Sequence, residues 1–202
     1  MRKIEIVCMI ALVAFLGFAQ KSFALAIGEG DLTIRANTSG TYDNNVTYVD
    51  SSEKDDFIST VGVGADYLFE GKTRSLKFTG NLQRNIFWDN DDFSNTAGDL
   101  RVEFKNEFTA YDRMTVRDVF IHAEDPRSFE DSFGRSQGRY SYYRNNFDID
   151  YTHDFTQQFS LRSYYANDIS EYSRVDLRDS MLHNIGFEGF YQWNSETSFV
   201  GT

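Results

Sequence analysis

The sequence predicts an all-β protein, an antiparallel up-and-down transmembrane β-barrel. Three observations lead to this fold class. Apolar and polar residues alternate with a period of two through most of the chain, which is typical of strands with two different faces. Short and long polar connections alternate between these segments. The chain is also 16% aromatic and contains a single proline, a composition suited to paired strands.

The first 26 residues resemble a secretory signal peptide. Arg2 and Lys3 are followed by an apolar run over 6–19, and Ala24-Leu25-Ala26 supplies small residues at a cleavage site. The run of about 14 residues is shorter than the roughly 20 needed to span a bilayer as a helix, which disfavours an N-terminal anchor. We therefore expect a signal peptide at 1–26 and a barrel domain at 27–202; a cut after Ala19 is the alternative.

The chain of 202 residues is long enough for one domain of ordinary size, and its alternating segments follow one another. They are expected at 31–37, 60–69, 76–86, 99–108, 114–123, 143–151, 159–166 and 184–193, with a ninth beginning at 197.

The segment 99–108 shows the pattern most clearly. Leu100 and Val102 share one face, and Asp99 and Arg101 share the other, which an α-helix would not achieve. The segment 114–123 is ambiguous, and a bulge that shifts its register by one residue would reconcile its two halves. The segment 159–166 is mixed.

The connections alternate in length, as in outer-membrane barrels with short periplasmic turns and long external loops. Short turns are expected near 70–75, 109–113, 154–158 and 194–196, and long loops near 43–56, 89–94, 124–139 and 167–179. Aromatic residues gather beside the short turns, as in the girdle of an outer-membrane barrel.

A strand edge exposed to lipid would leave backbone donors and acceptors unpaired, so these strands imply a closed barrel. Bacterial single-chain barrels close on even strand numbers. The sequence contains about eight or nine strands, and the last one is interrupted at Thr202. We therefore expect an incomplete part of a larger barrel that is truncated at its C-terminus. An eight-stranded barrel with a short tail is the alternative.

The candidate functional residues are charged side chains on the polar faces of the strands. The expected pore-lining set is Lys77, Asp99, Arg101, Glu103, Lys105, Arg144, Asp148, Asp150 and Glu188. In a wide barrel these charges would line water and set ion selectivity, whereas in a narrow one they would pair across strands and plug the lumen. The sequence leaves both interpretations open.

Other candidates are weaker. Asp89-Asn90-Asp91-Asp92 is rich in oxygen ligands but lacks the glycine turn and distant glutamate of a calcium loop, so a solvated acidic loop is favoured. The loop 124–139 carries three arginines and is expected to be an external loop, with a constriction of the lumen or recognition of an anionic sugar as alternatives. His122, His153 and His183 lie on separate segments. No catalytic motif is present, so we expect no enzyme activity, no cofactor and no metal.

The stretch Thr41-Tyr42-Asp43-Asn44-Asn45-Val46, after the first alternating segment, resembles the opening of the β-barrel porin 2 family of outer-membrane proteins. Asn44 departs from the aspartate usual in that family. The resemblance otherwise rests on pattern: Asp55-Asp56-Phe57 before the second strand and the tyrosine-rich strands after Gly138. It implies an outer-membrane location and a channel-forming function, and it transfers no catalytic residue.

The expected environment follows from these features. The net charge of −11 argues against nucleic acid, because phosphate binding requires clustered Lys and Arg. The expected partners are outer-membrane lipid and lipopolysaccharide of a Gram-negative bacterium and the barrel-insertion machinery, with a homo-oligomer left open. The first hypothesis is porin-like passage of small polar solutes, or polysaccharide export, through a polar lumen. A structural or adhesive barrel with a plugged lumen and functional loops is the second, and a soluble barrel with an apolar interior is the third.

Overall fold

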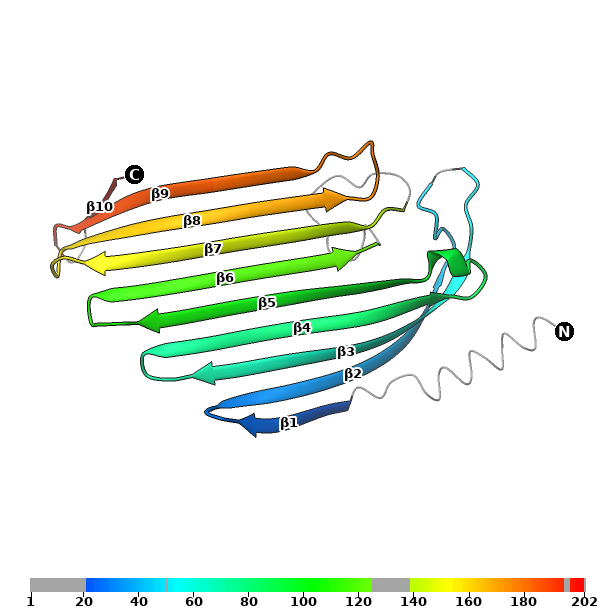
Figure 1. Ribbon diagram of the computed structural model, residues 1–202, viewed down its shortest axis with the longest axis horizontal. Coiled ribbons are helices and arrows are strands. Elements are labelled where there is room, and N and C mark those ends of the chain that lie inside the picture. Colours follow the sequence, from blue (N-terminus) through cyan, green and yellow to red (C-terminus); the bar gives the residue numbers. More distant parts are fainter. Residues whose placement is uncertain (1–20, 50, 125–138, 195–196, 202) are drawn as a thin grey trace.

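The computed structural model is one antiparallel sheet of ten strands (Figure 1). It describes residues 21–49, 51–124, 139–194 and 197–201. The strands are β1 Lys21–Ile27, β2 Gly30–Asp43, β3 Asp56–Glu70, β4 Arg74–Phe87, β5 Asn95–Glu107, β6 Asp112–Ala123, β7 Tyr142–Asp154, β8 Phe159–Tyr172, β9 Ser180–Gln192 and β10 Ser198–Gly201, with a 3-10 turn η1 at Asp91–Phe93. Within these ranges no helix is long and apolar enough to cross a membrane.

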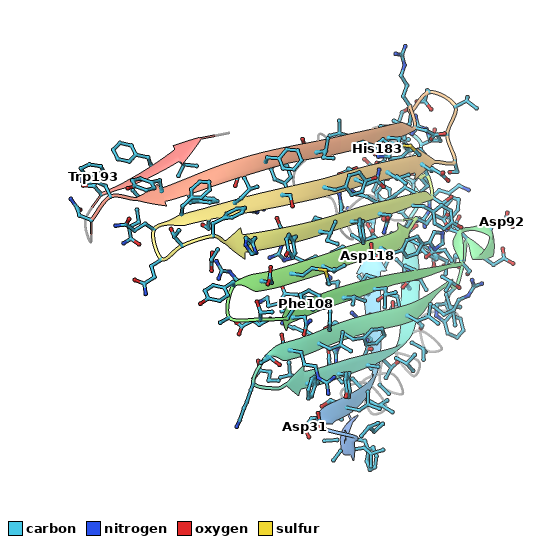
Figure 2. The ribbon with its side chains drawn as sticks, turned by 60° about the vertical axis from the view of Figure 1, so that its left-hand side comes forward. Asp31, Asp92, Phe108, Asp118, His183 and Trp193 are labelled. Carbon is cyan, nitrogen blue, oxygen red and sulfur yellow. The ribbon has the colours of Figure 1, made fainter. Side chains whose placement is uncertain are left out.

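Each strand pairs with the next one along the chain, so the order in the sheet is the order in the sequence. The sheet is not closed, and β1 and β10 form its two edges. The short connections lie at one end of the strands, which we call the hairpin end, and the long connections lie at the other, the loop end (Figure 1). In Figure 2, Phe108 and Trp193 lie at the hairpin end and Asp92 at the loop end. The predicted up-and-down topology is therefore confirmed.

The eight alternating segments and the ninth are strands β2 to β10. The prediction missed β1, because its residues fall largely within the expected signal peptide. The bulge predicted in β6 was wrong. Its pairing with β5 runs without interruption from Glu107↔Arg113 to Gly98↔His122, and its pairing with β7 is equally regular. The mixed segment 159–166 belongs to a longer strand, β8, so the connection that follows it covers only 173–179.

The two faces of the sheet differ sharply in charge. The cross-strand pairing assigns every residue to a face, since neighbours in register point the same way. One face, which we call the polar face, carries Asp31, Arg35, Asp43, Asp56, Asp66, Glu70, Lys77, Asp99, Arg101, Glu103, Lys105, Glu107, Arg113, Arg117, Arg144, Asp148, Asp150, Asp154, Arg162, Asp168 and Glu188. We call the other face the apolar face. On β2 to β10 its charged residues are Arg74, Arg84, Asp112, Asp118 and Glu171.

Burial also differs between the faces. Along β4, Leu82 and Ile86 of the apolar face are 55% and 41% exposed. The neighbouring residues of the polar face, Asn81, Gln83 and Asn85, are half-buried. Side chains on the concave side of a curved sheet converge and lose exposure, so this pattern fits a sheet with its polar face inside. The apolar face is unusually exposed for a protein in water, where large contiguous apolar patches are rare.

The only extended packing among the described residues covers the polar face at its loop end. Ala97, Ala123, Tyr140 and Tyr142 form a small buried cluster there, with Tyr172 packed against it. Tyr140 comes from the segment before β7, so connecting residues fold over the polar face rather than over the apolar one. The middle and the hairpin end of this face have no such cover from the described loops.

The hairpins are staggered in one direction. The lateral row Leu32, Tyr67, Phe78, Val102, Asp118, Phe147, Asn167 and His183 follows the pairing from β2 to β9. Counted from this row, the last paired residue at the hairpin end lies two positions away on β2, three on β3, five on β5, seven on β7 and nine on β9. A stagger of constant sign tilts the strands, which is the geometry required of a closed barrel.

Strand β1 bears on the expected cleavage site. A cut after Ala26 would remove six of its seven residues, whereas a cut after Ala19 would leave the strand whole. Residues 1–20 lie outside the described part of the chain. The pairing with β2, from Lys21↔Ala36 to Ile27↔Gly30, therefore favours the alternative site.

We predict that the exported protein begins at Gln20. Peptidase cleavage after Ala19 retains the apolar residues Phe23, Leu25 and Ile27 that β1 contributes to the apolar face. Mass spectrometry of the protein purified from a bacterial cell envelope would determine its first residue. A mature chain that starts at Ile27 would contradict the prediction and would exclude β1 from the exported fold.

Candidate lumen wall

All nine predicted pore-lining residues lie on the polar face. Lys77 is in register with Glu103, which in turn is in register with Arg117 of β6. Asp148 lies opposite Arg117 on β7, and Glu188 of β9 lies opposite Arg162 of β8. The face assignment made from the sequence is therefore correct for each of these residues.

Arg117 forms ion pairs with three carboxylates of the polar face. Its Nε donates to Glu103 at 3.1 Å, and its Nη1 donates to Asp148 at 2.8 Å and to Asp150 at 3.2 Å. One guanidinium thus joins carboxylates from β5 and β7, the strands on either side of β6. Its planar fork of donors makes this possible, whereas a lysine ammonium offers a single point of charge.

Arg162 continues the chain of contacts toward β9. Its Nε donates to Asp150 at 2.7 Å and its Nη1 donates to Glu188 at 2.9 Å. Lys105 extends the chain on the other side with a 2.8 Å ion pair to Glu103. We call these seven residues, from Lys105 to Glu188, the charge belt: Glu103, Lys105, Arg117, Asp148, Asp150, Arg162 and Glu188. It crosses five strands, and its charges alternate in sign.

A second network covers β2 to β5. Arg35 donates to Asp66 at 2.7 Å and to the side-chain oxygen of Asn81 at 3.2 Å. Asn81 donates in turn to Asp99 at 3.1 Å, and Asp99 also accepts from Arg101 at 3.3 Å. Nearer the loop end of the face, Arg144 lies 3.2 Å from Asp168, which also accepts from Asn146.

The predicted pore-lining set lacks five charged residues of these networks: Arg35, Asp66, Arg117, Arg162 and Asp168. Arg117 was left out of the predicted set because the segment 114–123 was ambiguous and a bulge was expected there. Arg162 and Asp168 belong to β8, whose pattern was mixed since Tyr164 and Ala166 share its polar face. For Arg117, the uninterrupted alternation of the partner strand β7 was the signal that could have corrected the register.

A cation–aromatic cluster around Arg139 lies at the loop end of the polar face. Its guanidinium lies 4.7 Å from the ring centre of Phe87, 5.0 Å from that of Phe93 and 5.7 Å from that of Tyr48. It also donates to the backbone carbonyl of Val46 at 3.3 Å. Arg139 therefore ties three connections together across the mouth of the sheet, which favours the constriction alternative for the end of the loop 124–139; residues 125–138 lie outside the described part.

Asp56 holds the connection between β4 and β5 in place. Its buried carboxylate accepts hydrogen bonds from the backbone amides of Trp88, Asp89 and Asn90 at 2.8–3.0 Å. The side-chain amide of Asn90 adds a further bond at 2.9 Å. Asn90 belongs to the acidic stretch that was weighed as a calcium loop, and both its backbone amide and its side-chain amide are bonded to Asp56.

The remaining candidates have local roles. No group of three or more side chains suited to a metal ion occurs among the described residues. His122 stacks on Tyr143, His153 lies 2.7 Å from Asp112, and His183 lies 2.9 Å from the Tyr165 hydroxyl. In the exposed connection between β8 and β9, the hydrogen bonds from Arg174 lower the pKa of Asp176 below its usual range.

One charged residue breaks the pattern of the apolar face. Asp118 lies in the middle of β6 on that face, and it accepts a hydrogen bond from Asn145 of β7 at 2.6 Å. Figure 2 labels it midway along the sheet. The four other charged residues of this face lie near the strand ends, so Asp118 is the one costly position if the face contacts lipid.

The chain matches no family model, no curated protein and no solved structure. The chemistry of the polar face therefore has to be inferred from its own geometry. That geometry provides a wall of fixed charges held by neighbouring strands, with oxygen and nitrogen atoms available to water or to a polar solute.

We predict that Arg117→Gln destabilises the fold by roughly 1–2 kcal/mol, because it leaves three neighbouring carboxylates without their shared donor. Arg84→Gln is the matched control, since Arg84 lies on the apolar face with one hydrogen bond, to Thr96 at 3.2 Å. Denaturant unfolding of both variants would give the two free energies of unfolding. Equal losses would show that the charge belt does not hold the strands together.

Proposed function

We propose that this chain forms part of a closed outer-membrane β-barrel and that its polar face lines a water-filled lumen for small polar solutes. The observation that carries the proposal is the separation of charge between the faces. Twenty-one charged residues lie on the polar face of the strands and five on the apolar face of β2 to β10.

This separation is what a bilayer imposes. A charged side chain at the lipid face of a barrel costs up to about 2–4 kcal/mol at the midplane, less for Asp and Glu, whereas a lumen position has access to water. In a soluble sheet with both faces in water, charge would not need to avoid one face. The exposed Val61, Val63, Ile185 and Phe187, all on the apolar face, suit contact with hydrocarbon.

A lipid environment would also require the sheet to close into a barrel. In lipid, the free edges of β1 and β10 would leave backbone donors and acceptors unpaired at several kcal/mol each. The stagger of the hairpins supports tilted strands that curl into a barrel. In a closed barrel, the edges of β1 and β10 would pair with each other or with further strands.

The location rests on three supports. The N-terminal segment has the pattern of an export signal. Exposed aromatic residues lie at or beside the hairpin end, including Phe108, Tyr111, Phe155 and Trp193, where a membrane–water girdle is expected. The stretch 41–46 resembles the β-barrel porin 2 family.

A plugged structural or adhesive barrel is the second candidate, and a specific observation favours it. The charge belt pairs acids and bases across five strands, and the loop end is tied down by Arg139. The third hypothesis, a soluble barrel with an apolar interior, requires the apolar face to point inward. The greater exposure of Leu82 and Ile86 on that face disfavours it.

Single-channel recording separates the first two candidates. We expect the full-length gene product, refolded into a planar lipid bilayer, to give stable stepwise conductance, because the polar face is lined with hydrated charge. Circular dichroism of the same refolded sample would verify its β-structure. A folded, inserted protein without conductance would contradict the open lumen and favour the plugged barrel.

A further inference from the structure

The balance of charge on the polar face indicates which solutes the lumen would favour. Acidic side chains outnumber basic ones, thirteen to eight, among the residues assigned to this face by strand pairing. These acids are distributed over six strands, β2, β3, β5, β7, β8 and β9, rather than gathered in one cluster. We propose, building on the channel function above, that the lumen prefers cations and that its ends rather than the charge belt set this preference.

The basic residues of the wall are already committed to carboxylates. Seven of the eight lie within ion-pair distance of an acid: Arg35, Arg101, Lys105, Arg113, Arg117, Arg144 and Arg162. An anion entering the lumen would have to compete with those carboxylates for each guanidinium. The eighth, Lys77, lies in register between Leu68 and Glu103.

The belt itself has nearly balanced charge. Three bases, Lys105, Arg117 and Arg162, stand against four acids, so their fields largely cancel over a short distance. Alternating charges of this kind create a strong local field but little net potential. The belt is therefore a poor filter for the sign of a small ion.

Three acids of the polar face for which the described residues provide no ion pair lie toward the strand ends. Asp31, Glu70 and Glu107 are exposed at the hairpin end of β2, β3 and β5. Arg113, the neighbour of Glu107 in register, is held by Asp154 through two bonds, at 2.5 and 2.9 Å. Lys72 in the β3–β4 turn offsets only part of this negative charge.

The loop end has the same sign. The connections described there carry the exposed acids Glu53, Asp55, Asp89, Asp91, Asp92, Asp176 and Asp179 against the exposed bases Lys54 and Arg178. The half-buried Arg139 and Arg174 are in ion pairs with Glu124 and Asp176. Fixed charge of one sign at an entrance concentrates the opposite ion, over a Debye length of about 10 Å at 0.1 M salt and about 3 Å at 1 M. Both entrances would therefore concentrate cations.

The test is the reversal potential of the full-length gene product in planar bilayers under a KCl gradient. We expect potassium to be more permeant than chloride near 0.1 M salt, with the preference fading near 1 M because of screening. An open channel with no preference, or with a preference for chloride, would overturn the inference alone. Absence of conductance would instead overturn the channel function on which it rests.

A triple variant tests whether acids at the hairpin end contribute to the cation preference. Neutralising the hairpin-end acids, by Asp31→Asn, Glu70→Gln and Glu107→Gln together, should lower the potassium-to-chloride permeability ratio by roughly twofold, since fixed charge at an entrance governs ion concentration there. Glu171→Gln, an exposed acid on the apolar face, is the control and should leave the ratio unchanged. Equal ratios in the triple variant and the wild type would overturn the assignment to the ends. If the triple variant fails to fold, the salt dependence of the wild-type ratio still decides the cation preference.

Discussion

The structure depends first on the pairing of backbone hydrogen-bonding groups between adjacent strands. In the lipid interior no water can satisfy an unpaired amide or carbonyl, so a spanning sheet must pair every strand and close on itself. The single proline of the chain and the uninterrupted registers of β2 to β9 are consistent with this requirement. The period of two follows, because consecutive side chains of a paired strand point to opposite faces.

In the proposed barrel, lipid on one face would determine the chemistry of the other. Most charged side chains of the strands lie on the polar face, where they come close together on neighbouring strands. Arg117 and Arg162 resolve the resulting crowding of carboxylates by bonding to several at once, from two different strands each. The same contacts that compensate charge therefore also hold the register of the strands.

The sequence was sufficient for most of the fold because period-two alternation is a local signal. It identified nine of the ten strands and grouped the nine predicted lumen residues on one face, as the strand pairing does. It failed where two local signals competed. The apolar residues of β1 also have the pattern of a signal peptide, and a charged residue, Asp118, on the same face as Val116 and Phe120 imitated a bulge. The cross-strand partners of Arg117 and the loop contacts of Arg139 could not be predicted, since they depend on the register between strands and on the path of the connections.

The most direct test of the account is a cysteine scan along β4 in the protein reconstituted into lipid vesicles. The sole cysteine, Cys8, lies within the expected signal peptide, so the mature chain provides a cysteine-free background. The account predicts that spin labels at Leu76 and Phe78 contact oxygen dissolved in the lipid, and that labels at Lys77 and Thr79 contact a water-soluble relaxation agent. Alternation with this phase would support a lipid-facing apolar face and a water-lined polar face. Equal access of the water-soluble agent to all four positions would contradict the membrane barrel.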